Sequence, residues 1–177
     1  MFQMTAIEAL EDEIRQKARN FLALAESHDL PLRVTCTRRT LMEQARLYRQ
    51  GRSLHEIHAK ATELEHTWGR ADLAHILMGV GPQYKPNIVT NAGPGQSLHN
   101  YGLALDVVPL VNGQPNWDDK SKAGLNRWGS IGRLGEHCGM EWGGRWHHPD
   151  RPHFQVNGSH WEKVIRTWKW TDDQRGH

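Results

Sequence analysis

Two short segments of this sequence hold residue types that bind metal ions. The first, GQSLHNYGLALDVV, carries His99 and Asp106 seven residues apart. Its second half is short and almost wholly apolar, which is typical of a buried strand, yet Asp106 stands in the middle of it. A carboxylate buried without a partner costs on the order of several kcal/mol, so such a group is normally paired or bound to a metal. The segment therefore predicts either an arginine or a metal ion beside Asp106.

The second segment, HHPDRPHFQV, adds a further carboxylate and a further imidazole, Asp150 and His153. Catalytic zinc sites take three protein ligands of the His and Asp/Glu types and leave the fourth position to water. His99, Asp106 and His153 would make such a set, with one Zn²⁺ per chain. Asp150 would remain beside the metal as the general base that activates water.

Other residues could fill the same roles. His147 or His148 could replace His153 as a ligand, since all three lie in one short segment. Glu141 could act as the base in place of Asp150, or could instead hold a metal-bound histidine in position.

Composition and charge exclude several classes of function. The chain has 177 residues, which suits one domain, and a net charge of +2, which is too weak to indicate nucleic-acid binding. No run approaches the roughly eighteen apolar residues that a membrane crossing needs. The first residues lack a basic segment followed by an apolar core, so we expect no signal peptide and synthesis in the cytoplasm. Cys36 and Cys138 form no Cys-x-x-Cys pair, which favours a reducing compartment and leaves one disulfide open.

Helical periodicity dominates the first half of the chain. The predicted helices cover residues 5–27, 40–51, 53–68 and 124–138, with a possible continuation of the third helix over residues 71–78. Three of them begin at capping boxes, in which Ser or Thr precedes Glu by three residues. His55 and His58 are spaced i, i+3 on the third helix, so they either bind a metal or form an exposed polar face.

Strands are predicted mostly around the centre. They cover residues 32–37, 88–90, 104–111, 141–142 and 153–156. Asn112 and Gly113 predict a tight turn after the longest strand. No linker or internal repeat interrupts the pattern. We therefore expect one α+β domain over residues 1–177, in which helices flank a small central antiparallel sheet and the zinc lies in a cleft over the sheet.

Three segments together resemble a known family of peptidases. SLHNYGLALDVV resembles the Ser-x-His-x-x-Gly-x-Ala-x-Asp motif of the zinc peptidases related to D-alanyl-D-alanine carboxypeptidases. EWGGRWHHPDRPHFQV is similar to the second motif of that group, a Trp-Gly-Gly segment followed by an acidic residue, two others and a zinc-binding His. Within the group, Val89 to Ala104 and Arg38 to Arg52 resemble the phage endolysin branch, the L-alanyl-D-glutamate peptidases.

The resemblance implies a role for each motif residue. His99, Asp106 and His153 match the zinc ligands of the family. Asp150 matches the catalytic acid that activates water at the metal.

The earlier segment carries further implied contacts. Arg39 matches an arginine that steadies a substrate carbonyl or carboxylate, and Ser97 matches the motif serine, with an implied contact to substrate. Arg38 and Thr40 depart from the family's tyrosine and serine, which leaves the finer substrate contacts open. Residues 53–87 are longer than the corresponding loop, so we expect a helical insertion there.

The function implied is that of a zinc-dependent peptidoglycan peptidase, an endolysin that cuts the stem peptide at the L-Ala–D-Glu bond. A carboxypeptidase that releases D-Ala and a catalytically silent phage tail or wall-binding module are the alternatives. The expected partner is the peptidoglycan stem peptide, with no nucleic acid and no stable membrane association. We expect a monomer without a separate wall-binding domain, which reaches the cell wall after release through a holin-type opening.

Overall fold

The computed structural model describes residues 7–176, and the chain in it forms two compact units. The first unit contains the residues up to Arg38 together with Gly102–Ser159. The second contains Arg39–Tyr101 together with the residues from His160 onward. Each unit is thus built from two separate stretches of the chain. None of the helices within residues 7–176 has both the length and the apolar character that a membrane crossing requires.

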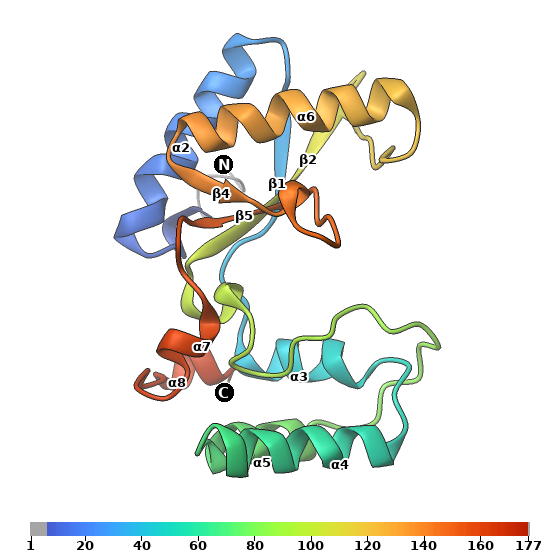
Figure 1. Cartoon of the computed structure of the whole chain (residues 1–177), viewed down its shortest axis with the longest axis vertical. Helices are drawn as coiled ribbons and strands as arrows, with labels where there is room; N and C mark the ends of the chain where they lie inside the picture. Colours follow the sequence, from blue (N-terminus) through green and yellow to red (C-terminus); the bar gives the residue numbers. More distant parts are fainter. Residues whose placement is uncertain (1–6, 177) are drawn as a thin grey trace. The chain divides into compact units, whose positions relative to one another are not determined.

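The first unit is an antiparallel sheet covered by helices (Figure 1). The strands run in the order β1-β2-β5-β4, and a short β3 pairs with β2. Their bounds are β1 Leu32–Cys36, β2 Ala104–Val111, β3 Gln114–Pro115, β4 Met140–Trp142 and β5 His153–Val156. Two long helices, α2 (Asp12–Ser27) and α6 (Lys122–His137), pack on the strands and on each other. The predicted α+β class, with helices flanking an antiparallel sheet, is confirmed.

Aromatic rings fill the space between these helices and the sheet. The ring of Phe154 on β5 lies 4.7 Å from that of Phe21 on α2, measured between centroids. Helix α6 approaches the same face so closely that a Cβ on Gly135 would lie 2.3 Å from the Phe154 ring. Burying each such ring contributes about 1.5–3 kcal/mol, so this face is the core of the unit.

The second unit is helical. Its elements are α3 (Leu41–Arg49), α4 (Leu54–Thr62), the π-helical turn η1 (Glu63–Thr67), α5 (Ala71–Gly79), the 3₁₀ turn η2 (Leu98–Tyr101), α7 (Trp161–Val164) and α8 (Asp172–Arg175). Capping boxes begin α3 and α4, as predicted, at Thr40 and Ser53. Arg70 joins the two stretches of this unit, because its guanidinium donates to the carbonyls of Ile165 and Trp168.

The structure differs from the sequence prediction in three places. The predicted first helix is interrupted: residues 7–8 are helical, residues 9–11 leave the helical path, and α2 begins at Asp12. At the break the amide of Glu11 donates to the carbonyl of Gly102 (3.0 Å). The capping threonine at position 5 lies outside the described residues. Residues 71–78 do not continue the helix that starts after Ser53: η1 ends at Thr67, Gly69 has a left-handed φ of 69°, and α5 begins separately at Ala71.

The third difference is at residues 88–90, which form no strand. Ile88 and Val89 are about half exposed, and Thr90 Oγ1 accepts a hydrogen bond from the amide of Ala92. A local bond of this kind replaces the sheet pairing that their β-branched side chains favour. The tight turn at residues 112 and 113 is confirmed, because both have positive φ and join β2 to β3.

Candidate metal centre

Sheet pairing brings Asp106 and His153 together. The two residues stand directly opposite each other on β2 and β5, so their side chains leave the sheet on the same face. His153 Nδ1 lies 3.3 Å from Asp106 Oδ1. The two side chains are only 9% and 22% exposed. This pair is the part of the predicted ligand set that lies within the first unit.

The donor atoms of this pair suit zinc. Imidazole nitrogen and carboxylate oxygen bind Zn²⁺ at about 2.0–2.2 Å, and two ligand atoms of a tetrahedral zinc therefore lie roughly 3.3 Å apart. The separation of His153 Nδ1 and Asp106 Oδ1 agrees with that value. The two side chains fit two positions of one zinc ion.

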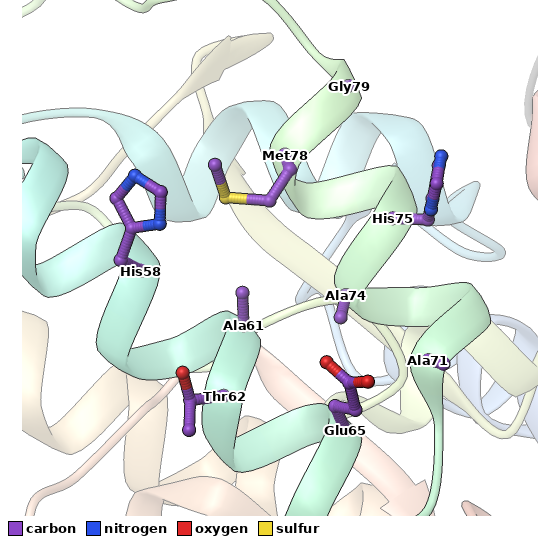
Figure 2. Close-up of a pocket in the computed structure, with 9 residues that line it drawn as sticks. All are labelled: His58, Ala61, Thr62, Glu65, Ala71, Ala74, His75, Met78 and Gly79. Carbon is purple, nitrogen blue, oxygen red and sulfur yellow. The ribbon is translucent and has the colours of Figure 1, made fainter.

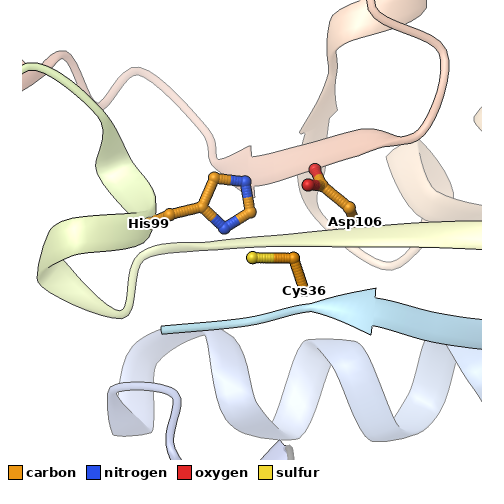
Figure 3. Close-up of side chains that lie close together, drawn as sticks. All are labelled: Cys36, His99 and Asp106. Carbon is orange, nitrogen blue, oxygen red and sulfur yellow. The ribbon is translucent and has the colours of Figure 1, made fainter. Parts of the chain in front are cut away.

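A cysteine that the sequence did not indicate lies beside Asp106. Cys36 pairs with Asp106 across β1 and β2 after a bulge that follows Val34, and its Sγ lies within 4.8 Å of the carboxylate. Figure 3 shows both side chains extending from these neighbouring strands, with His99 on η2 as its third labelled residue. Cys36 and Cys138, which both lie in the described part of the chain, are not joined by a disulfide. Since thiolate is also a zinc ligand, Cys36 adds a donor type to this face of the sheet.

The other predicted residues belong to the second unit, where hydrogen bonds tie them together. The amide of Arg39 donates to the carbonyl of His99 (3.0 Å). Asn100 accepts from the amide of Gly95 and donates to the carbonyl of Arg39, at 2.9 and 3.0 Å. The backbone amide of Asn100 donates to the carbonyl of Ser97 (3.0 Å). Arg39, Ser97 and His99 are thus held in one local network.

The buried side-chain amide of Gln44 also fixes the Arg39 guanidinium. Arg39 Nη1 donates to Gln44 Oε1 (2.8 Å), and Gln44 Nε2 donates to the carbonyl of Ala92 (2.7 Å). Gln44 is fully buried. This arrangement orients a permanent positive charge next to the segment that carries His99.

Asp150 lies in the loop that precedes β5. Its amide donates to the carbonyl of Gly143 (3.0 Å), and its carbonyl accepts from the amide of His153 (3.3 Å). Asp150 is exposed and lines a cavity of about 180 Å³ whose other lining residues are Trp117, Asp119, Trp128, Pro149, Arg151 and Pro152. Neither Asp106 nor His153 lines this cavity, so the role of Asp150 as the base stays a prediction from the sequence.

The competing histidines and Glu141 have other contacts. His147 and His148 are exposed, and their rings lie edge to face with centroids 4.5 Å apart. Glu141 accepts a hydrogen bond from Trp146 Nε1 (2.9 Å), and the Trp146 ring lies 5.1 Å from that of His153. Glu141 and His153 therefore both contact the side chain of Trp146.

A second hollow, of about 580 Å³, lies between α4 and α5 in the helical unit. His58 and His75 line it from opposite sides (Figure 2). Among the described residues, neither belongs to a group of three potential metal ligands. Both His55 and His58 are exposed on α4.

The match to a known family covers the segment that carries His99, Asp106, Asp150 and His153. Residues 90–156 match the family model described as D-alanyl-D-alanine carboxypeptidase. Over 148 residues the chain is 29% identical to the peptidoglycan L-alanyl-D-glutamate endopeptidase CwlK of Bacillus subtilis (strain 168), covering 81% of this chain and 71% of that protein. These matches confirm the resemblance of the sequence motifs to that group of peptidases.

Two solved structures are similar to the chain. One is the L-Ala D-Glu endopeptidase ChiX of Serratia marcescens, with a TM-score of 0.49 and 17% identity over 87% of this chain and 85% of that chain. The other is the D,D-pentapeptidase VanY from a VanB-type resistance cassette, in complex with Zn(II), with a TM-score of 0.45 and 14% identity over 84% of this chain and 73% of that chain.

Proposed function

We infer that this chain belongs to the D-alanyl-D-alanine carboxypeptidase family whose model matches residues 90–156, and we propose that it is a zinc-dependent peptidoglycan peptidase. The observation that carries the proposal is the pair of His153 Nδ1 and Asp106 Oδ1, 3.3 Å apart on facing strands inside the matched segment. A nitrogen and a carboxylate oxygen at that separation are suited to one zinc ion.

His99 is proposed as the third ligand. It lies in the first motif, five residues before β2 begins, and the motif resemblance assigns it to the metal. Two histidines and one aspartate make a three-ligand catalytic zinc set with one position open to water. Ser97 is proposed to contact the substrate from the same turn.

The chemistry proposed for the chain is peptide hydrolysis by an activated water. A bound zinc ion lowers the pKa of water to about 7 and polarises a carbonyl oxygen. The Asp150 carboxylate accepts the proton of the attacking water and passes it to the leaving amine. The Arg39 guanidinium, oriented by Gln44, stabilises the negative charge that develops on the carbonyl oxygen or holds a substrate carboxylate.

The bond proposed for cleavage is that between L-Ala and D-Glu of the stem peptide. The similarity to CwlK, a protein named for that cleavage, supports this choice. The resemblance of Val89–Ala104 and Arg38–Arg52 to the endolysin branch supports a phage lysis role, with a monomeric enzyme released to the wall through a holin-type opening. Host cells that contain the protein in their cytoplasm should lyse only after their membrane is permeabilised, and that result would support the lysis role.

The test of the activity uses purified peptidoglycan. Zinc-loaded protein, chelator-treated protein and an Asp150→Ala variant are incubated with it, and the released ends are identified by mass spectrometry. We expect zinc-dependent release of new D-Glu amino termini that is lost in Asp150→Ala. Release of free D-Ala would assign the carboxypeptidase alternative. Tight zinc binding without cleavage of any wall preparation would overturn the proposal and favour the silent wall-binding module.

A further inference from the structure

The residue that follows His153 by two positions lies on the same face of β5 and contacts it. Gln155 is 5% exposed, and its Oε1 lies 3.0 Å from His153 Nε2. Alternate residues of a strand point to the same side, so the spacing of His153 and Gln155 places both on the face that carries Asp106. Gln155 was assigned no role from the sequence.

A backbone carbonyl fixes the orientation of the Gln155 side-chain amide. Its Nε2 donates to the carbonyl of Ser159 (3.1 Å). A carbonyl oxygen only accepts hydrogen bonds, so the Gln155 atom that faces Ser159 must be the amide nitrogen. The amide oxygen is then the atom that faces His153, and this oxygen also only accepts hydrogen bonds. His153 Nε2 must therefore carry the ring proton.

The turn that positions the Ser159 carbonyl is itself held. The amide of Ser159 donates to the carbonyl of Val156 (3.1 Å), and Gly158 within this turn has a left-handed φ of 71°. Glu141 Oε2 accepts from the amide of Gly158 (3.4 Å). The direction of the Gln155 amide therefore follows from a folded turn of the first unit.

The consequence concerns the other ring nitrogen of His153. A neutral imidazole carries one proton, so with Nε2 protonated the lone pair lies on Nδ1, the atom 3.3 Å from Asp106 Oδ1. Without Gln155 the competing arrangement is open, in which Nδ1–H donates to the Asp106 carboxylate and blocks the metal-binding atom. A ligand's outer hydrogen bond selects which nitrogen is available to the metal.

We propose that Gln155 is the positioning residue that holds His153 in the Nε2–H form, so that Nδ1 is presented beside Asp106 as the metal ligand. The proposal rests on the proposed function only in naming zinc as the ion bound. The arrangement of protons is a property of the metal-free protein and can be measured without any activity.

The test compares Gln155→Met, which keeps the side-chain length and removes the acceptor, with Gln155→Glu, which keeps an acceptor oxygen. Gln174→Met, a buried glutamine of α8 (6% exposed), is the matched control for losing a buried amide. Histidine ¹⁵N NMR of the metal-free full chain reports which nitrogen of His153 is protonated. Competition with a chromophoric chelator gives the zinc Kd, and thermal unfolding verifies that each variant is folded.

We expect the Nε2–H form in the unmodified protein and in Gln155→Glu, and a shift towards Nδ1–H in Gln155→Met. Loss of such an outer contact typically weakens metal binding about 10- to 100-fold, and we expect a rise of that size in the zinc Kd of Gln155→Met, with Gln174→Met unchanged. An Nδ1–H form in the unmodified protein would overturn the proposal even if Gln155→Met fails to fold. An unchanged tautomer and Kd in folded Gln155→Met would also overturn it. Absence of peptidoglycan cleavage together with the expected NMR result would contradict the proposed function alone.

Discussion

Gly143 and Asp150 are in backbone contact at a distance that admits no side chain on the glycine. The Asp150 amide donates to the Gly143 carbonyl (3.0 Å), and a Cβ on Gly143 would lie 2.6 Å from the Asp150 carbonyl oxygen. That carbonyl in turn accepts from the amide of His153. The position of the proposed base therefore depends on a residue without a side chain.

Gly143→Ala is expected to lower the rate of peptidoglycan hydrolysis at least tenfold, because the loop must move to relieve the contact. Misplacement of a catalytic group by about 1 Å can cost about 100-fold. Gly81→Ala, where an added Cβ meets nothing within 4 Å, is the control. Equal rates for the two variants, measured as release of new amino termini, would show that the loop tolerates the methyl group.

Asp150→Asn is expected to separate metal binding from hydrolysis. The amide keeps the size of the side chain and removes its ability to accept a proton, and general-base catalysis typically contributes about 10²–10⁴-fold. The hydrolysis rate should fall by that factor while the zinc Kd changes little. A large rise in the zinc Kd would instead identify Asp150 as a ligand.

Arg39→Ala is expected to reduce kcat by roughly 10²–10³-fold, the usual cost of removing one stabiliser of a developing oxyanion. Gln44→Leu should give part of the same loss, because Gln44 orients the guanidinium through a 2.8 Å hydrogen bond. An unchanged kcat with a raised KM in Arg39→Ala would assign Arg39 to ground-state binding of a substrate carboxylate. Steady-state kinetics on a soluble stem-peptide substrate distinguish these results.

Two glycines of α6 provide a matched pair for stability. A Cβ on Gly132 would lie 2.2 Å from the indole of Trp142, whereas a Cβ on Gly129 would meet only the flexible end of Arg133, at 3.6 Å. Gly132→Ala should destabilise the fold by about 1–3 kcal/mol through overpacking, and Gly129→Ala should stabilise it by up to about 1 kcal/mol through helix propensity. Urea unfolding measures both. Stabilisation by Gly132→Ala would contradict the close packing of α6 on β4.

Asp72 should contribute to the loss of folding stability at acid pH. Two hydrogen bonds from the Arg70 guanidinium, at 2.6 and 2.8 Å, hold the pKa of the Asp72 carboxyl below its usual value of 3.8, although partial burial acts in the opposite direction. A lowered folded-state pKa means that the stabilisation is present above 3.8 and is lost as the pH falls through the lower folded value. Because Asp72 is 43% exposed, the effect is at most about 1 kcal/mol.

Asp72→Asn is therefore expected to lower the melting temperature at neutral pH and to match the unmodified protein in strong acid. Thermal unfolding from pH 7 to pH 2 tests this. A constant difference between the two proteins over that range would exclude the ion pair as its source.

The sequence predicted what lies within one segment better than what two segments form together. Strand periodicity located β2 and β5, and residue chemistry singled out Asp106 and His153 within them. That these two residues face each other depends on sheet register, which no single segment determines. The assignment of His99, Asp150, Arg39 and Ser97 remains a prediction.

Residues that act through tertiary pairing were missed for the same reason. Cys36 reaches the face of Asp106 only because a bulge after Val34 shifts the register, and a bulge leaves no reliable mark in one sequence. Gln155 could have been noticed from its i, i+2 spacing to His153 on a predicted strand. Residues 88–90 were predicted as a strand from their β-branched side chains, which also occur in exposed loops.

The four glycines of α6 couple that helix to the strand that carries His153. Each glycine costs a helix about 0.8–1.0 kcal/mol relative to alanine, so residues 122–137 have little reason to be helical as a separate peptide. The helix forms because Gly132 and Gly135 admit the rings of Trp142 and Phe154. Amide protons of α6 and β5 should therefore exchange with solvent in a single opening event, and neither element should lose its protection while the other keeps it.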